Sequence, residues 1–125
     1  MYPREYLQGI SLFNAGRYFD AHEAWEEIWL RSSGDDKLFY QMLIQSAVGL
    51  HHYERGNCRG GRGMHKAVTE KLSRLPSLYK SLDLKEFSRQ FRSFFADIIE
   101  TDEDSTPPPD RPRPLIRLLS GAHKS

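Results

Sequence analysis

The sequence predicts an all-α protein, a compact bundle of about five helices arranged as two stacked helical hairpins and a closing helix. Proline, which interrupts helices, does not occur between residues 4 and 75. Within that stretch, apolar residues recur every three or four positions, as in helices with one buried side. The 125 residues have the length of one domain, which we assign to residues 1–100, with a linker and tail over residues 101–125.

The first two helices are expected to form a hairpin. The first begins after Pro3, which suits a first helical turn, and ends at the turn Asn14-Ala15-Gly16. Its apolar residues at helical spacing are Tyr6, Ile10 and Phe13. The second is predicted over residues 18–32 and ends at a turn rich in serine and glycine. Its apolar side carries Ala21, Trp25, Ile28 and Trp29.

The third predicted helix, residues 36–55 with Asp35 as its N-cap, carries apolar residues nearly all the way round. Such a helix is expected at the centre of the bundle. The fourth covers residues 58–75 and is stopped by Pro76. Asp83 is expected to cap the last helix. The stripe of large apolar residues on that helix consists of Phe87, Phe91, Phe94, Phe95, Ile98 and Ile99.

Small residues repeat at an interval of forty positions. The repeated pairs are Gly9 with Gly49, Gly16 with Gly56, and Ala21 with Gly61. In both copies a helix ends at glycine, another begins after a tight turn, and a small residue stands where two helices are expected to cross. The spacing also resembles the turn of a tetratricopeptide hairpin. The repeat therefore predicts two stacked antiparallel hairpins, which the last helix closes.

The composition changes after Glu100. Residues 101–110 combine acidic residues with three consecutive prolines, which favours an extended or disordered linker. The following segment, Pro114–Leu119, is apolar again. It is expected to pack on the domain, and a short docking peptide is the alternative.

Composition also limits the function classes. The 18 Lys and Arg residues nearly balance the 17 Asp and Glu residues, for a net charge of +1, which argues against a protein that mainly coats nucleic acid. No apolar run approaches the roughly 20 residues of a membrane helix, and the N-terminal residues lack the apolar region of a signal peptide. The single cysteine, Cys58, cannot form an internal disulfide. We therefore expect a cytoplasmic protein that does not bind membranes.

Polar residues at helical spacing mark a candidate site. On the predicted second helix, His22 and Glu26 lie four positions apart and share a face. The predicted third helix carries two glutamines and a histidine at spacings of four and seven, on an otherwise apolar helix. Such groups need partners when buried, so they form either a structural network or a ligand pocket between the two helices. The predicted pocket consists of His22, Trp25, Glu26, Trp29, Gln41, Gln45 and His52.

A histidine and a glutamate four positions apart can also contribute to a metal site. The metal-ligating set predicted here is His22, Glu26 and His52, which would hold a divalent metal as the cofactor. In a small metal-dependent hydrolase built on this site, Glu23 or Glu27 would act as the general base.

The predicted fourth helix and the turn before it are basic. The residues at helical spacing are Arg55, Arg59, Arg62 and Lys66. This stripe is either an ordinary solvated face or a contact for phosphate or an acidic partner. Binding of nucleic acid through this stripe is the weaker functional hypothesis.

Two segments together are similar to a known family. They are Phe13–Trp29 and Phe39–Leu50, followed by His52, Gly56-Asn57 and Gly60. Over about residues 4–75 the chain resembles the domain of unknown function 309 family, small all-helical proteins of bacteria and archaea. The resemblance implies a helical bundle with stacked hairpins and implies no activity, substrate or cofactor.

The function hypothesis that follows is a cytosolic helical module that binds a partner protein or a small ligand in the polar pocket between helices. The metal-dependent enzyme is the alternative from another class. Self-assembly of the chain stays open.

Overall fold

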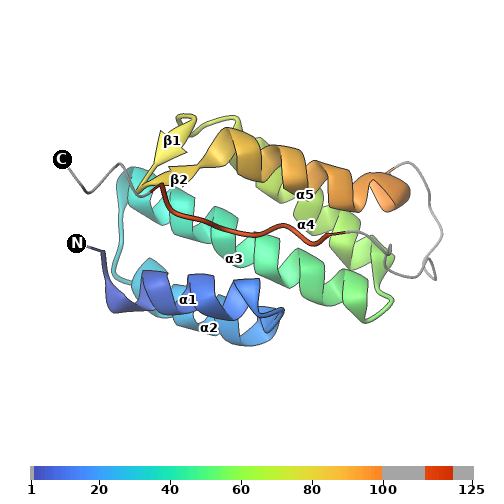
Figure 1. The fold of residues 1–125 in the computed structure, drawn as a ribbon, viewed down its shortest axis with the longest axis horizontal. Helices are drawn as coiled ribbons and strands as arrows, with labels where there is room; N and C mark the ends of the chain where they lie inside the picture. The colour runs from blue at the N-terminus through green and yellow to red at the C-terminus, as the bar shows by residue number, and fades with distance from the viewer. Residues whose placement is uncertain (1, 100–111, 120–125) are drawn as a thin grey trace.

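The structure, a computed structural model, describes residues 2–99 and 112–119. The described residues are mostly helical, with one two-stranded antiparallel hairpin (Figure 1), so the all-α class is confirmed. The helices are α1 (Arg4–Asn14), α2 (Tyr18–Trp29), α3 (Gly34–Glu54), α4 (Cys58–Leu72) and α5 (Leu84–Ile99). The strands are β1 (Leu78–Tyr79) and β2 (Leu82–Asp83).

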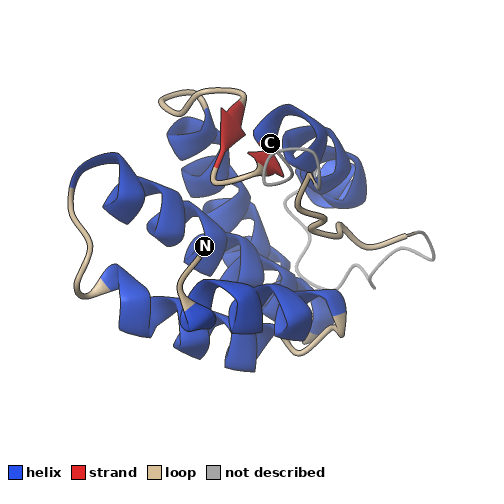
Figure 2. Cartoon of the chain, turned by 60° about the vertical axis from the view of Figure 1, so that its left-hand side comes forward, coloured by secondary structure: helices blue, strands red, loops and turns tan. Residues whose placement is uncertain are grey.

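Helix α3 lies at the centre, between the α1–α2 pair and the α4–α5 pair (Figure 1), as its apolar sequence predicts. Its fully buried side chains include Phe39, Leu43, Ala47 and Leu50. The two strands lie at one end of the bundle, directly before α5 (Figure 2). Among the described residues, no helix is both long enough and apolar enough to cross a membrane.

The two hairpins close with the same turn. Gly16 and Gly56 both adopt the left-handed conformation, each with φ of +81°. Behind them, the N–H of Arg17 donates to the Leu12 carbonyl at 2.9 Å, and the N–H of Asn57 donates to the His52 carbonyl at 2.8 Å. These bonds satisfy helix-end carbonyls in the Schellman arrangement. The forty-residue repeat is therefore present in the backbone.

Two other repeated glycines let neighbouring helices approach. A Cβ atom on Gly9 would lie 2.1 Å from Nε1 of Trp25, and one on Gly49 would lie 2.9 Å from Cβ of Met64. At the first crossing the indole lies fully buried against α1, and its N–H donates to the Tyr6 carbonyl at 3.2 Å. Only glycine leaves room for these contacts.

Helix boundaries follow the local signals with three exceptions, and the first is the end of α2, which lies at Trp29 and not at the predicted residue 32. Asp83 caps α5, because its carboxylate accepts the N–H of Glu86 at 3.0 Å. The prediction of Asp35 as the cap of α3 is wrong, because the helix already begins at Gly34, after Ser33. Helix α4 ends at Leu72, three residues before the predicted end.

The β1–β2 hairpin is absent from the sequence-based prediction. Its turn, Lys80-Ser81, has positive φ at both residues, +48° and +65°. Two-residue hairpin turns favour positive φ, which residues other than glycine rarely adopt. The Tyr6 hydroxyl donates to the Lys80 carbonyl at 2.9 Å, and the hydroxyls of Tyr2 and Ser81 share a hydrogen bond of 2.6 Å. Because these partners lie more than 70 positions away, no local pattern predicts the turn.

The segment Pro114–Leu119 packs on the helices, as expected, and runs along α3 between α1 and α5 (Figure 1). Ile116 is buried, and the Asn14 side chain holds its backbone through two hydrogen bonds of 2.8 Å, one donated and one accepted. The Gln90 side chain accepts the preceding backbone N–H at 2.9 Å. The linker predicted over residues 101–110 lies outside the described residues.

Candidate functional site

The predicted polar residues of α2 and α3 lie on one side of the bundle. Side chains at helical spacing along α3 are only half-buried there, in contrast to the fully buried remainder. On α2, residues at spacings of three and four border the same side. We call this the α2–α3 face, and it consists of Phe19, His22, Glu26 and Trp29 of α2 and Lys37, Gln41, Gln45, His51 and His52 of α3.

Two contacts fix how α2 lies against α3. At one end, Nζ of Lys37 is 4.6 Å from the centre of the Trp29 ring. At the other end, the ring centres of Phe19 and His51 are 5.8 Å apart. The two helices are therefore antiparallel, and the middle of α2 lies alongside the middle of α3, which carries the two glutamines.

His22 is oriented by its own helix. Its Nδ1 donates to the Phe19 carbonyl at 2.7 Å, because a carbonyl oxygen can only accept. In the neutral ring, Nε2 is therefore the acceptor. The Phe19 ring, 52% exposed, lies 5.0 Å from the His22 ring and covers one side of it. This arrangement presents an aromatic surface with one nitrogen acceptor.

His52 belongs to the turn before α4. The side-chain Nδ2 of Asn57 donates to Nδ1 of His52 at 3.3 Å, and the side-chain Oδ1 of Asn57 accepts the N–H of Gly60 at 2.9 Å. A Cβ atom on Gly60 would lie 2.9 Å from the His52 ring. The ring therefore helps to hold the cap of α4, which is a structural role.

His51 lies at the same end of this surface as Phe19 and His52. Its ring centre is 6.3 Å from that of His52. Burial lowers the pKa of His51 below its ordinary value, and the positive charge of Arg55 lowers it further. His51 is therefore neutral at pH 7 and able to contribute hydrogen bonds without carrying charge.

Two buried polar atoms on the α2–α3 face have no hydrogen-bond partner among the described residues. One is the indole Nε1 of Trp29, a donor, and the other is the amide Oε1 of Gln45, an acceptor. Each atom left without a partner costs about 1–3 kcal/mol.

Other predicted pocket residues are placed differently. Trp25 lies between α1 and α2 in the core and takes no part in the α2–α3 face. Glu26 lies on the face but is exposed, and Gln41 is half-buried. The other six predicted residues lie on one open surface, and none of the seven lines the hollow between α4 and α5.

The predicted metal site is not assembled. Across residues 2–99 and 112–119, no three His, Cys, Asp or Glu side chains form a group that could hold a metal ion, so His22, Glu26 and His52 do not converge. Glu23 and Glu27, the predicted general bases, are exposed on α2.

The predicted basic stripe is divided by the fold. Arg55 and Arg59 are exposed near the α3–α4 turn. Arg62 and Lys66 border a separate hollow of about 550 Å³ together with His65 of α4 and Ile99 of α5. The stripe therefore contributes to two different surfaces.

Sequence reasoning missed three residues of the α2–α3 face, Phe19, Lys37 and His51. A signal for Phe19 is present, because it precedes His22 by three positions and so shares its side of the helix. His51 directly precedes the predicted His52, but a neighbour in sequence points in a different direction on a helix. Its place on the face follows only from the packing of α2.

Comparison with known proteins connects this surface to a family. Residues 6–64 match the model of domain of unknown function 309. The resemblance seen in the sequence is thereby confirmed over that span. The span runs from α1 to the first half of α4, so it contains every residue of the α2–α3 face.

Two curated relatives extend the comparison. An uncharacterized protein of Aquifex aeolicus (strain VF5) is 29% identical over 97 residues, which are 77% of this chain and 28% of that protein. The uncharacterized protein YpuF of Bacillus subtilis (strain 168) is 38% identical over 64 residues, which are 50% of this chain and 37% of that protein. The matched segment thus spans less than two fifths of each relative. The family and both relatives are of unknown function, so the function of this chain is unknown as well.

Proposed function

We propose that this protein is a cytosolic binding module that takes a polypeptide segment of a partner protein on the α2–α3 face. The observation that carries the proposal is the pair of buried atoms without partners, the donor Nε1 of Trp29 and the acceptor Oε1 of Gln45. A peptide backbone supplies a carbonyl for the first and an N–H for the second. The cytosolic location is supported by the single cysteine, Cys58, which cannot form an internal disulfide.

The bundle already holds one extended segment in this manner. The side-chain amides of Asn14 and Gln90 bind the backbone of the tail around Ile116. The glutamines of the α2–α3 face carry the same chemical group on another side of α3. Recognition of backbone by side-chain amides is thus within the chemistry of this chain.

The surroundings of the face indicate which side chains the partner segment carries. Phe19 offers an exposed ring for an apolar residue. Three exposed carboxylates, those of Glu23, Glu26 and Glu27, lie along α2. We therefore expect an apolar residue with basic residues beside it.

The first test separates binding from stability. Gln45→Leu removes a buried acceptor without a partner, so it is expected to raise the free energy of unfolding by about 1 kcal/mol while weakening partner binding. Urea unfolding measures the first quantity. A loss of stability in Gln45→Leu would show that this amide already serves the fold and would contradict the proposal.

The second test locates the partner segment. Peptides selected from a random library on the intact protein are mapped by amide chemical shifts, which are expected to change in α2 and α3. Phe19→Ser is expected to weaken these peptides by at least about tenfold, whereas Leu30→Ser, which removes another exposed apolar side chain at the end of α2, leaves affinity within about twofold. Selected peptides that bind both variants equally, or that map elsewhere, would refute the proposal.

A further inference from the structure

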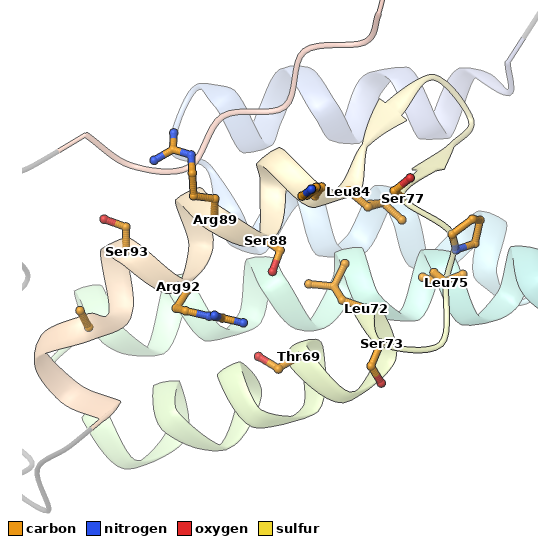
Figure 3. A pocket seen from close by; sticks show the side chains of 13 residues that line it. Thr69, Leu72, Ser73, Leu75, Ser77, Leu84, Ser88, Arg89, Arg92 and Ser93 are labelled. Carbon is orange, nitrogen blue, oxygen red and sulfur yellow. The ribbon is translucent and has the colours of Figure 1, made fainter.

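A second recognition surface lies between α4 and α5, on a part of the molecule that the α2–α3 face does not include. The hollow there has a volume of about 670 Å³ (Figure 3). Its apolar lining includes Leu72 of α4 and Leu84 and Ala96 of α5. A volume of this size is typical of sites for small molecules.

The charges around this hollow all have one sign. The lining includes Lys85, Arg89 and Arg92 and no carboxylate. Arg89 is neutralised by Glu86 through two hydrogen bonds of 2.9 and 2.7 Å. Lys85 and Arg92 have no ion pair among the described residues. Within the described residues, the hollow therefore has two positive charges without a counter-charge at an apolar wall.

The side chains converge from both helices. Figure 3 shows Arg92 and Ser88 of α5 directed toward Thr69 and Leu72 of α4, whereas Arg89 is directed away from α4. The hydroxyls of Ser88 and Thr69 make no hydrogen bond to the described residues, although a hydroxyl in a helix commonly bonds the carbonyl one turn earlier. Two hydroxyls and a guanidinium are thus available on the same side of the hollow.

We propose that the α4–α5 hollow binds a small amphipathic anion, with a phosphate or carboxylate head group and an apolar body. Lys85 and Arg92 hold the head group, and the guanidinium of Arg92 can do so through two parallel hydrogen bonds. The hydroxyls of Ser88 and Thr69 complete the hydrogen bonds of the head group. The apolar body lies on Leu72, Leu84 and Ala96. This site is independent of the partner segment proposed for the α2–α3 face.

The test uses the intact protein and four probes: octyl phosphate, octanoate, inorganic phosphate and octyltrimethylammonium. Saturable amide shift changes in α4 and α5 are expected with octyl phosphate, octanoate or both, and the comparison of the two identifies the head group. Inorganic phosphate lacks the apolar body and is expected to bind at least about tenfold more weakly. Equal binding by octyltrimethylammonium would overturn the proposal, because the hollow would then select only for apolar chains. Equal binding by inorganic phosphate would overturn it as well.

Variants assign the head group to its side chains. Arg92 and Lys85 are both exposed, so Arg92→Glu and Lys85→Glu are expected to fold normally, which amide spectra verify. Each is expected to weaken the anionic probe by at least about tenfold. Arg4→Glu, an equal change of charge on α1, is the matched control and is expected to leave affinity within about twofold. Unchanged affinity in both Arg92→Glu and Lys85→Glu would refute the assignment.

Discussion

The second helices of the two hairpins, α2 and α4, occupy equivalent places and carry different chemistry. Forty positions after His22, Glu26 and Trp29 stand Arg62, Lys66 and Thr69. The first set borders α3, and the second lines hollows beside α5. The first set carries a carboxylate, that of Glu26, whereas the second set carries two positive charges, those of Arg62 and Lys66.

This difference shows which parts of a hairpin the fold constrains. The turn at Gly16 recurs at Gly56 with the same φ, and the close approach at Gly9 recurs at Gly49. The side of the second helix that borders the next helix is not constrained in this way. Binding chemistry in each hairpin is therefore to be sought on that side, and the two proposed sites both lie there.

The buried position on this helix also differs between the hairpins. Trp25 is fully buried and its N–H has a carbonyl partner, whereas His65, forty positions later, stacks on Phe91 with ring centres 5.5 Å apart. Nε2 of His65 is buried and has no partner among the described residues. At this position the first hairpin has an indole whose N–H is hydrogen-bonded, whereas the second hairpin has a buried ring nitrogen without a partner among the described residues.

The largest expected effect tests the two helix crossings. Gly9→Ala would place a Cβ atom 2.1 Å from the Trp25 indole and displace its hydrogen bond, so a loss of about 3 kcal/mol in unfolding free energy is expected. Gly49→Ala meets Met64 at 2.9 Å, and a loss of about 1–2 kcal/mol is expected. Urea unfolding measures both. Equal losses would mean that the two crossings are equally tight, contrary to the geometry.

A smaller effect concerns the equivalent helix ends Asn14 and Glu54, both of which contact the tail. Asn14→Ala removes two hydrogen bonds to Ile116, and a loss of about 2 kcal/mol is expected. Glu54→Gln removes a partly exposed ion pair with Arg113 and is expected to cost less than about 1 kcal/mol. Chemical unfolding of the intact chain compares the two, and a larger loss in Glu54→Gln would reverse the ranking.

A third effect concerns His65 and depends on pH. Burial, and then the charge of Arg92, lower the pKa of His65, so the folded protein binds this proton less readily than the unfolded chain does. Neutral His65 therefore makes its full contribution to the free energy of unfolding at pH values above its ordinary pKa of 6.5. This contribution is lost as the pH falls below that value. His65→Phe is expected to stabilise the protein by about 1 kcal/mol at pH 8 and by more at pH 5.5.

Thermal or urea unfolding across this pH range measures the difference between His65→Phe and the parent protein. Part of the acid sensitivity remains in the variant, because the pKa of His51 is lowered as well. A difference that does not grow as the pH falls would contradict the assignment to His65.

Local signals predicted much of this fold. Gly16 and Gly56 end helices and Asp83 caps one, and their partners lie within a few residues in the sequence. Such short-range contacts can be predicted from local sequence patterns. The Lys80-Ser81 turn depends on Tyr2 and Tyr6, far away in the chain, so local reasoning could not find it.

The candidate site was predictable to the extent that helical spacing determines it. The stripe of Gln41, Gln45 and His52 follows from the period of α3, and the structure keeps it on one side. Trp25 and Trp29 lie four positions apart and so share a side of α2, yet only Trp29 reaches the α2–α3 face. The Trp25 indole packs instead against α1, where Gly9 leaves room for it. The α4–α5 hollow combines residues of two helices and the turn between them, so no single sequence pattern marks it.

The hydrogen bonds of Ser81 have a consequence for the order of folding during synthesis. The Ser81 hydroxyl shares a hydrogen bond with the Tyr2 hydroxyl, and the Ser81 carbonyl accepts the N–H of Leu119. Asn14 likewise binds a residue far along the chain, Ile116, which lies 102 positions later. During synthesis, Tyr2 and Asn14 therefore stay without these partners until Ser81 and Ile116 have been added to the chain. The entropy cost of closing so long a loop rises only with the logarithm of its length, so the long separation of these partners adds little to the cost of docking the tail.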